Sequence, residues 1–217
     1  MRVFCSVWLL LVSGFLATAQ EKLNPFEPEI LAFEASDRTN PPPQHGILFI
    51  GSSSIRMWKS LAADFPEHPV INRGFGGSQI VDSIHYANRI IFKYHPKQII
   101  LYAGGNDIHA GKSAKQVFSD FKDFVRTVRK GLPDTEIDYI SIAPNRSRWA
   151  EVERVKGANR LIEAYMGKES RLRFINVFPA MLGSDGEPKP DIYLDDKLHM
   201  NAKGYELWKG IVRPYLH

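Results

Sequence analysis

The stretch Gly46-Ile47-Leu48-Phe49-Ile50-Gly51-Ser52-Ser53-Ser54-Ile55 carries the clearest indication of how this chain folds. Its unbroken apolar run, residues 47–50, is typical of a β-strand that is buried on both faces. The run ends at a glycine and three serines, and a segment with helical spacing of apolar residues follows over residues 55–61. In open α/β sheets, ligands bind at the carboxyl ends of strands. The stretch therefore predicts a hydroxyl group at such a site, although serines before a helix also serve as helix caps.

The composition is that of an ordinary globular protein. The chain has 217 residues, of which 44% are hydrophobic and 24% charged, enough for one domain with a sizeable core. Its net charge is +4, and acidic and basic residues are interspersed rather than clustered, so no nucleic-acid partner is expected. The single cysteine, Cys5, lies in the N-terminal apolar segment, which excludes disulfides and cysteine metal sites from a mature chain that lacks this segment.

Residues 1–19 have the pattern of a signal peptide. Arg2 precedes an apolar segment over residues 3–17, and Ala17-Thr18-Ala19 fits a cleavage site before Gln20. The protein is therefore expected to be secreted or periplasmic, without stable membrane insertion after cleavage; an uncleaved anchor is the alternative. Residues 20–45 are expected to form an N-terminal helix and a lead-in, and residues 46–217 the main domain.

Apolar runs and helical patterns alternate along the rest of the chain. Four further strands are expected at residues 69–73, 98–103, 136–142 and 173–178. Helices are expected from about residue 28 to 39 and at residues 78–91, 113–130 and 149–166, with a last one after residue 201. Ser78 and Asn201 are the predicted caps of two of them. The alternation predicts an α/β fold, a three-layer αβα sandwich around a five-stranded parallel sheet.

The loops after the strands carry the residues that acyl transfer needs. A serine hydroxyl such as Ser53 is a weak nucleophile until a base takes its proton. His199 can be that base, and Asp196, three residues earlier, can hold its ring in the required tautomer. The oxyanion of the tetrahedral intermediate needs hydrogen-bond donors, which the backbone N–H groups of Gly77 and Ser53 and the side-chain amide of Asn106 can supply.

At these positions the chain resembles the SGNH hydrolases, also called GDSL-type esterases and lipases. The resemblance covers nearly the whole mature chain and rests on four blocks in order: Gly51-Ser52-Ser53-Ser54, Asn72-Arg73-Gly74-Phe75-Gly76-Gly77, Gly104-Gly105-Asn106-Asp107 and Asp196-Lys197-Leu198-His199. It implies Ser53 as nucleophile, and Gly77 and Asn106 in the oxyanion hole. It also implies a flavodoxin-like strand order 2-1-3-4-5 and no metal or organic cofactor. The chain departs from the family at Ser52, where the best-known motif has Asp, which leaves open what braces the nucleophile loop.

The function expected from these residues is that of an exported serine esterase acting on short acyl or O-acetyl groups, with a small-molecule or carbohydrate ester as substrate. Alternatives are a lysophospholipase or short-chain lipase, and a catalytically silent carbohydrate-binding protein with the same fold. Asp195 is a possible substitute for Asp196, whereas Asp107 is expected to fix its own loop. A metal site built from His109 and His199 lacks any ligand spacing. The pattern identifies no substrate-binding residues.

Overall fold

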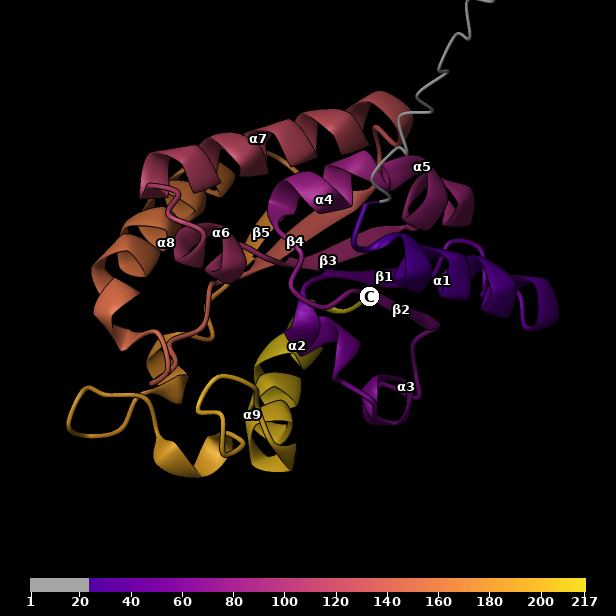
Figure 1. Ribbon diagram of the computed structural model, residues 1–217. Coiled ribbons are helices and arrows are strands. Elements are labelled where there is room, and N and C mark those ends of the chain that lie inside the picture. Colours follow the sequence, from indigo (N-terminus) through magenta and orange to yellow (C-terminus); the bar gives the residue numbers. More distant parts are fainter. Residues whose placement is uncertain (1–23) are drawn as a thin grey trace, which may run out of the picture.

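A five-stranded parallel sheet forms the centre of the protein, in the order β2-β1-β3-β4-β5 (Figure 1). The computed structural model describes residues 24–217, so the predicted signal peptide, residues 1–19, lies outside the described residues. The strands are β1 (Ile47–Gly51), β2 (Val70–Gly74), β3 (Gln98–Tyr102), β4 (Glu136–Ile140) and β5 (Leu172–Ile175). The predicted fold class and strand order are confirmed.

Helices cover both faces of this sheet. One face packs against α1 (Glu27–Thr39), α4 (Ile80–His85), α5 (Ala87–Ile90), α7 (Ala114–Gly131) and α8 (Val152–Met166). The other packs against α2 (Ser53–Arg56), α3 (Leu61–Asp64) and α9 (Ala202–Val212), while α6 (Gly105–His109) follows the end of β3. Figure 1 shows these two layers above and below the strands. Within residues 24–217, no helix combines the length and the apolar character that a membrane crossing requires.

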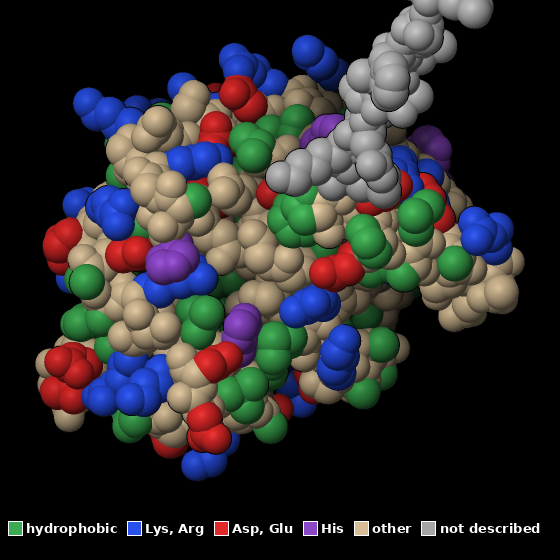
Figure 2. Space-filling model, viewed as in Figure 1, with side chains coloured by type: hydrophobic (Ala, Val, Ile, Leu, Met, Phe, Trp, Pro, Cys, Tyr) green, Lys and Arg blue, Asp and Glu red, His purple; other side chains and the backbone are tan. Residues whose placement is uncertain are grey.

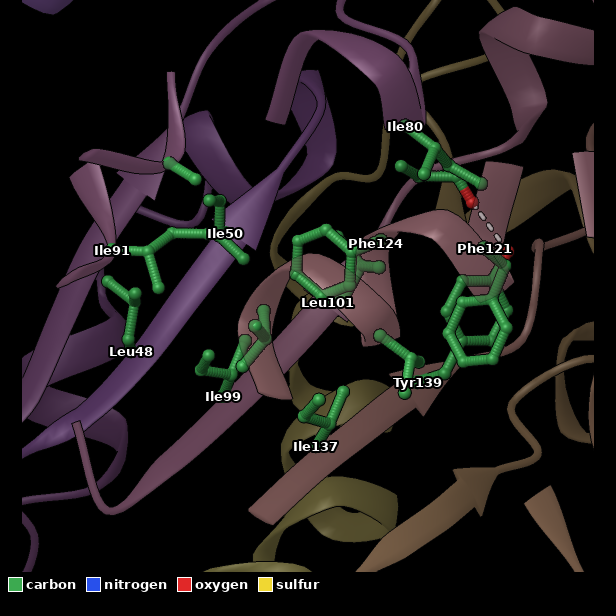
Figure 3. Packing of buried hydrophobic residues seen from close by; sticks show 14 of the residues in the cluster. Leu48, Ile50, Ile80, Ile91, Ile99, Leu101, Phe121, Phe124, Ile137 and Tyr139 are labelled. Carbon is green, nitrogen blue, oxygen red and sulfur yellow. Dashed lines mark hydrogen bonds between the residues drawn. The ribbon is translucent and has the colours of Figure 1, made fainter. Parts of the chain in front are cut away.

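The core consists of two clusters because successive strand residues point to opposite faces of the sheet. On β1, Leu48 and Ile50 join one cluster, and Ile47 and Phe49 join the other. Figure 3 shows the first cluster, in which strand residues meet helix residues such as Phe124 of α7. All four of these β1 side chains are fully buried, which explains why the strand has no polar residue.

Two of the predicted helices are broken in the structure. Residues 55–61 do not form one helix, because α2 ends at Arg56 and α3 begins at Leu61. Residues 78–91 are divided into α4 and α5 at Tyr86. Short helices of this kind depend on tertiary packing rather than on their own propensity, so the spacing of apolar residues does not reveal where they stop.

The two predicted helix caps have different outcomes. Asn201 does cap α9, since its side-chain oxygen accepts hydrogen bonds from the backbone N–H groups of Lys203 at 2.9 Å and Gly204 at 3.2 Å. The prediction for Ser78 is wrong: its hydroxyl donates backwards to the Phe75 carbonyl at 2.9 Å. The helix begins two residues later, because a turn comes first and keeps the Ser78 hydroxyl in the loop.

The N-terminal helix α1 is bound tightly to the rest of the domain. Its Ile30 is fully buried in the first core cluster. Arg89 of α5 forms ion pairs with Glu27 at 2.7 Å and with Glu34 at 2.6 Å, and Arg73 of β2 pairs with Asp37. Helix α1 therefore lies beside β2 and α5 at one edge of the sheet (Figure 1).

Candidate active site

Ser53 lies at the first position of α2, directly after a sharp turn at the end of β1. Gly51 has φ +129°, and a Cβ atom there would overlap the carbonyl of Tyr102 on the neighbouring strand. The next residue, Ser52, donates its backbone N–H to the same carbonyl at 2.9 Å. Glycine is thus required for β1 to run this close to β3 before the chain turns. The turn places the Ser53 side chain at the carboxyl end of the sheet.

Three side chains from two distant parts of the sequence form a continuous chain of hydrogen bonds. His199 Nε2 is 2.9 Å from Ser53 Oγ, and His199 Nδ1 is 2.6 Å from Asp196 Oδ2. The other carboxylate oxygen of Asp196 accepts from the backbone N–H groups of Leu198 and His199, both at 2.9 Å. The carboxylate therefore fixes both the turn and the ring. The geometry suits an Nδ1–H donor and an Nε2 acceptor facing the Ser53 hydroxyl.

The pKa of Asp196 gives a test of this arrangement. Burial raises it, but hydrogen bonds from the His199 ring and from two backbone N–H groups outweigh burial and lower it from 3.8 to about 2. A carboxyl group with a lower pKa in the folded state stabilises the fold above its unfolded value of about 3.9, and loses this effect as pH falls through the folded value. Above about pH 4, we expect the free energy of unfolding of wild type to be higher than that of the Asp196→Asn variant. This difference should vanish towards pH 2.

Denaturant unfolding of both proteins between pH 2 and pH 7 measures this difference. It should be small, because 46% of the Asp196 side chain is exposed and solvent screens the interaction. A difference that grows as the pH falls below 4 would contradict the hydrogen-bonded carboxylate.

Asn106 and Gly77 are the two other residues expected to bind an oxyanion. They are linked because Asn106 bonds to Ser78, the residue that follows Gly77. Asn106 Nδ2 donates to the Ser78 carbonyl at 3.0 Å, and its Oδ1 accepts from Arg148 at 3.0 Å. These two bonds determine which way the amide faces, and the second hydrogen of its NH2 group remains for a substrate. Gly77 has φ +81°, and the nearby Phe75 N–H donates to the Gly51 carbonyl at 2.9 Å. Asn106, in α6, and Gly77, in the loop after β2, are thus both held by hydrogen bonds of their own segments.

Asn72 braces the turn that carries Ser53, a role that the sequence did not reveal. Its amide nitrogen donates to the Ile55 carbonyl at 2.7 Å, and its oxygen accepts from Gly74 N–H at 2.9 Å. The bonds connect β2 to α2, which begins at Ser53. Ser52, within this turn, is only 7% exposed, and it does not cap α2 with its side chain. The family's usual Asp is replaced here by Ser52, and the side-chain amide of Asn72, on the neighbouring strand, is one of the groups that hold this turn in place.

Asp107 fixes its surroundings rather than facing a substrate. It is fully buried, it accepts from the Ile80 N–H at 3.3 Å, and it pairs with Lys112 at 2.9 Å. Burial raises its pKa, and the Lys112 ammonium partly offsets this effect. Asp107 thus connects α6, which carries Asn106, to the start of α4. This position agrees with the structural role expected for it.

The remaining candidates lie outside the chain of hydrogen bonds. Asp195 is exposed, and the carboxylate that bonds to His199 is that of Asp196 rather than that of Asp195. His109 is 57% exposed and is 3.0 Å from Glu151, so it does not approach His199 as a shared metal site would require. Arg148, from the loop after β4, donates to Asn106 Oδ1 at 3.0 Å.

A small cavity of about 40 Å³ opens beside Ser53. Figure 2 shows the face on which the site lies, with histidine and charged side chains gathered between α6 and α9. The lining of the cavity includes Ser53, Asn106 and His199. It also includes Ala143 and a group of bulky side chains, which are Tyr102, Met181, Tyr193, Met200 and Trp208. The sequence did not indicate Ala143 and these bulky side chains as a group, because they come from five separate segments.

Comparison with known proteins places the chain among acylhydrolases. Residues 50–207 match the model of the GDSL-like Lipase/Acylhydrolase family. The chain is 25% identical to the platelet-activating factor acetylhydrolase IB subunit alpha1 of Bos taurus, covering 91% of this chain and 77% of that protein. A GDSL-like lipase from Bacteroides thetaiotaomicron has a TM-score of 0.74 at 16% identity, covering 86% of this chain and 96% of that one. A carbohydrate esterase family 3 structure from Talaromyces cellulolyticus has a TM-score of 0.64 at 16% identity, covering 78% and 94%.

Proposed function

The chain belongs to the GDSL-like lipase/acylhydrolase family, and we propose that it hydrolyses carboxylic esters with Ser53 as nucleophile, His199 as base and Asp196 as the group that orients the base. The resemblance to SGNH hydrolases is thereby confirmed. The observation that carries the proposal is the continuous chain of hydrogen bonds from Asp196 through His199 to Ser53, with distances of 2.6 and 2.9 Å. Such a chain activates a hydroxyl that is otherwise a poor nucleophile.

The proposed reaction has two halves. His199 Nε2 takes the Ser53 proton as Oγ attacks the ester carbonyl, and the resulting oxyanion accepts hydrogen bonds from the Gly77 and Ser53 N–H groups and the Asn106 amide. The intermediate collapses to an acyl-enzyme as the imidazolium returns its proton to the leaving alcohol. A water molecule, deprotonated by His199, then attacks the acyl carbonyl and releases the carboxylic acid and the free Ser53 hydroxyl.

The cavity beside Ser53 supports a short acyl group. Its volume of about 40 Å³ is small, which favours a short acyl group over a long chain. The bulky side chains of Tyr102, Met181 and Trp208 are among those that line it. Two of the similar proteins are named as an acetylhydrolase subunit and a carbohydrate esterase, which agrees with this size. We infer a preference for O-acetyl groups, carried by carbohydrate outside the cell if residues 1–19 direct export.

A panel of p-nitrophenyl esters with acyl chains of two, four and eight carbons, together with an acetylated xylo-oligosaccharide, tests the substrate class. We expect the highest kcat/KM for the acetyl ester and a decrease of at least about tenfold at eight carbons, because one methylene in a tight pocket changes the ratio by about 10-fold or more. Activity that rises with chain length would instead indicate a lysophospholipase or lipase. No turnover and no labelling of Ser53 by a fluorophosphonate would indicate a silent binding protein.

A further inference from the structure

The first turns of α1 cover the loop that holds Gly77. Phe26 packs edge-to-face on Phe75, with ring centroids 5.3 Å apart, and its ring also lies 4.0 Å from where a Cβ on Gly77 would be. One turn further along, the Glu29 carboxylate accepts the Gly76 N–H, with both oxygens at 3.3 Å. A helix from the beginning of the chain thus contacts three consecutive residues of the loop between β2 and α4.

Glu29 also contacts the helix that begins at Ser53. The Arg56 guanidinium, at the end of α2, is 3.4 Å from the Glu29 carboxylate. The same guanidinium lies against Gly76, where a Cβ atom would come within 2.5 Å of its central carbon. Glu29, Gly76 and Arg56 therefore form a three-way contact that joins α1, the loop of Gly77 and the nucleophile helix. We call it the Glu29 contact.

The loop needs such a contact because its glycine-rich sequence makes its backbone flexible. Gly74, the last residue of β2, and two of the first three loop residues, Gly76 and Gly77, are glycines, which lose the most conformational freedom on ordering. A backbone donor stabilises an oxyanion only when it is already placed, since a displacement of about 1 Å can reduce the rate about 100-fold. The Gly76 N–H belongs to the peptide unit just before that of the Gly77 N–H, so the Glu29 contact fixes the adjoining unit.

We propose that Glu29 is a positioning residue for the oxyanion hole, and that α1 is consequently part of what makes the site competent. The inference rests on the proposed esterase function and on Gly77 as a donor. A hydrogen bond from a backbone N–H to a carboxylate is stronger than one between neutral groups, which suits it to hold a flexible loop. The ion pair with Arg56 adds little stability of its own, because its two side chains are 33% and 45% exposed. The main effect of Glu29 is therefore to hold the loop backbone in position, rather than to raise the stability of the fold.

The test compares wild type with Glu29→Ala, Glu29→Asp and Glu29→Gln, using p-nitrophenyl acetate and a fluorophosphonate. We expect Glu29→Ala to lower kcat about tenfold and to change KM less than about twofold, because the donor is displaced rather than removed; full removal lowers kcat by about 10²–10³. Phosphonylation of Ser53 should slow by a similar factor. Glu29→Asp keeps the charge, but its shorter side chain moves the carboxylate oxygens away from the Gly76 N–H. Its kcat should therefore fall as in Glu29→Ala. Glu29→Gln keeps an acceptor oxygen and should retain most of the activity.

Glu34→Ala is the matched control. Glu34 lies on the same helix and bonds to Arg89 at 2.6 Å, away from the loop of Gly77. It should leave kcat within about twofold of wild type. An unchanged kcat in both Glu29→Ala and Glu29→Asp, or an equal loss in Glu34→Ala, overturns the positioning role. If wild type neither hydrolyses the acetyl ester nor reacts with the fluorophosphonate, the proposed function itself has failed.

Discussion

Replacement of Ser53 by alanine is expected to lower kcat for p-nitrophenyl acetate by about 10⁵–10⁶-fold. In serine hydrolases the loss of the nucleophile is about as severe as the loss of all three acting side chains, because the three work as a unit. Here Ser53 Oγ is the atom that His199 Nε2 contacts at 2.9 Å. The oxyanion donors remain in the variant, so we expect a residual rate above that of water alone.

Steady-state kinetics and fluorophosphonate labelling of the purified variant measure this loss. Ser60→Ala is the matched control, because Ser60 is an exposed serine nearby whose hydroxyl donates to Asp64 at 2.6 Å rather than to the site. The control should keep wild-type kcat and labelling. If the Ser53→Ala protein folds normally and retains more than about one hundredth of the wild-type kcat, the proposed mechanism is wrong.

Replacement of Asp196 by asparagine is expected to lower kcat about 10⁴-fold, the second-largest effect. The amide oxygen of the variant can still accept the backbone N–H groups of Leu198 and His199, so the turn should keep its shape. Its NH2 group would then face His199 Nδ1, where the carboxylate oxygen now lies at 2.6 Å. An N–H donor at this position forces a proton onto Nε2, which then has no lone pair to take the Ser53 proton.

Asp195→Asn provides the comparison that distinguishes the two adjacent carboxylates. Asp195 is exposed and should be replaceable with less than about a twofold change in kcat. Kinetics of both variants, with circular dichroism to establish folding, measure the contrast. A greater loss from Asp195→Asn than from Asp196→Asn would reassign the orienting carboxylate to Asp195.

The strands were predictable because their signal is local. An unbroken apolar run such as residues 47–50 requires burial on both faces, and alternation with helical patterns leaves a parallel sheet as the solution. The order of the strands came from the resemblance carried by the four blocks. The helices were less predictable: α4 and α5 are separate, and the Ser78 hydroxyl bonds to Phe75 instead of capping a helix. Where a short helix starts or stops depends on packing against distant residues.

The parallel α/β fold and the residues expected to do chemistry could be predicted from the sequence, because strand burial and the residue types at strand ends are local features. How those residues are held is visible only in the folded protein. The Asn72 bond to Ile55, the Arg148 bond to Asn106 and the Glu29 bond to Gly76 join positions 17, 42 and 47 residues apart. No local pattern records such a pairing, since a hydrogen bond depends on where the folded backbone brings two groups together.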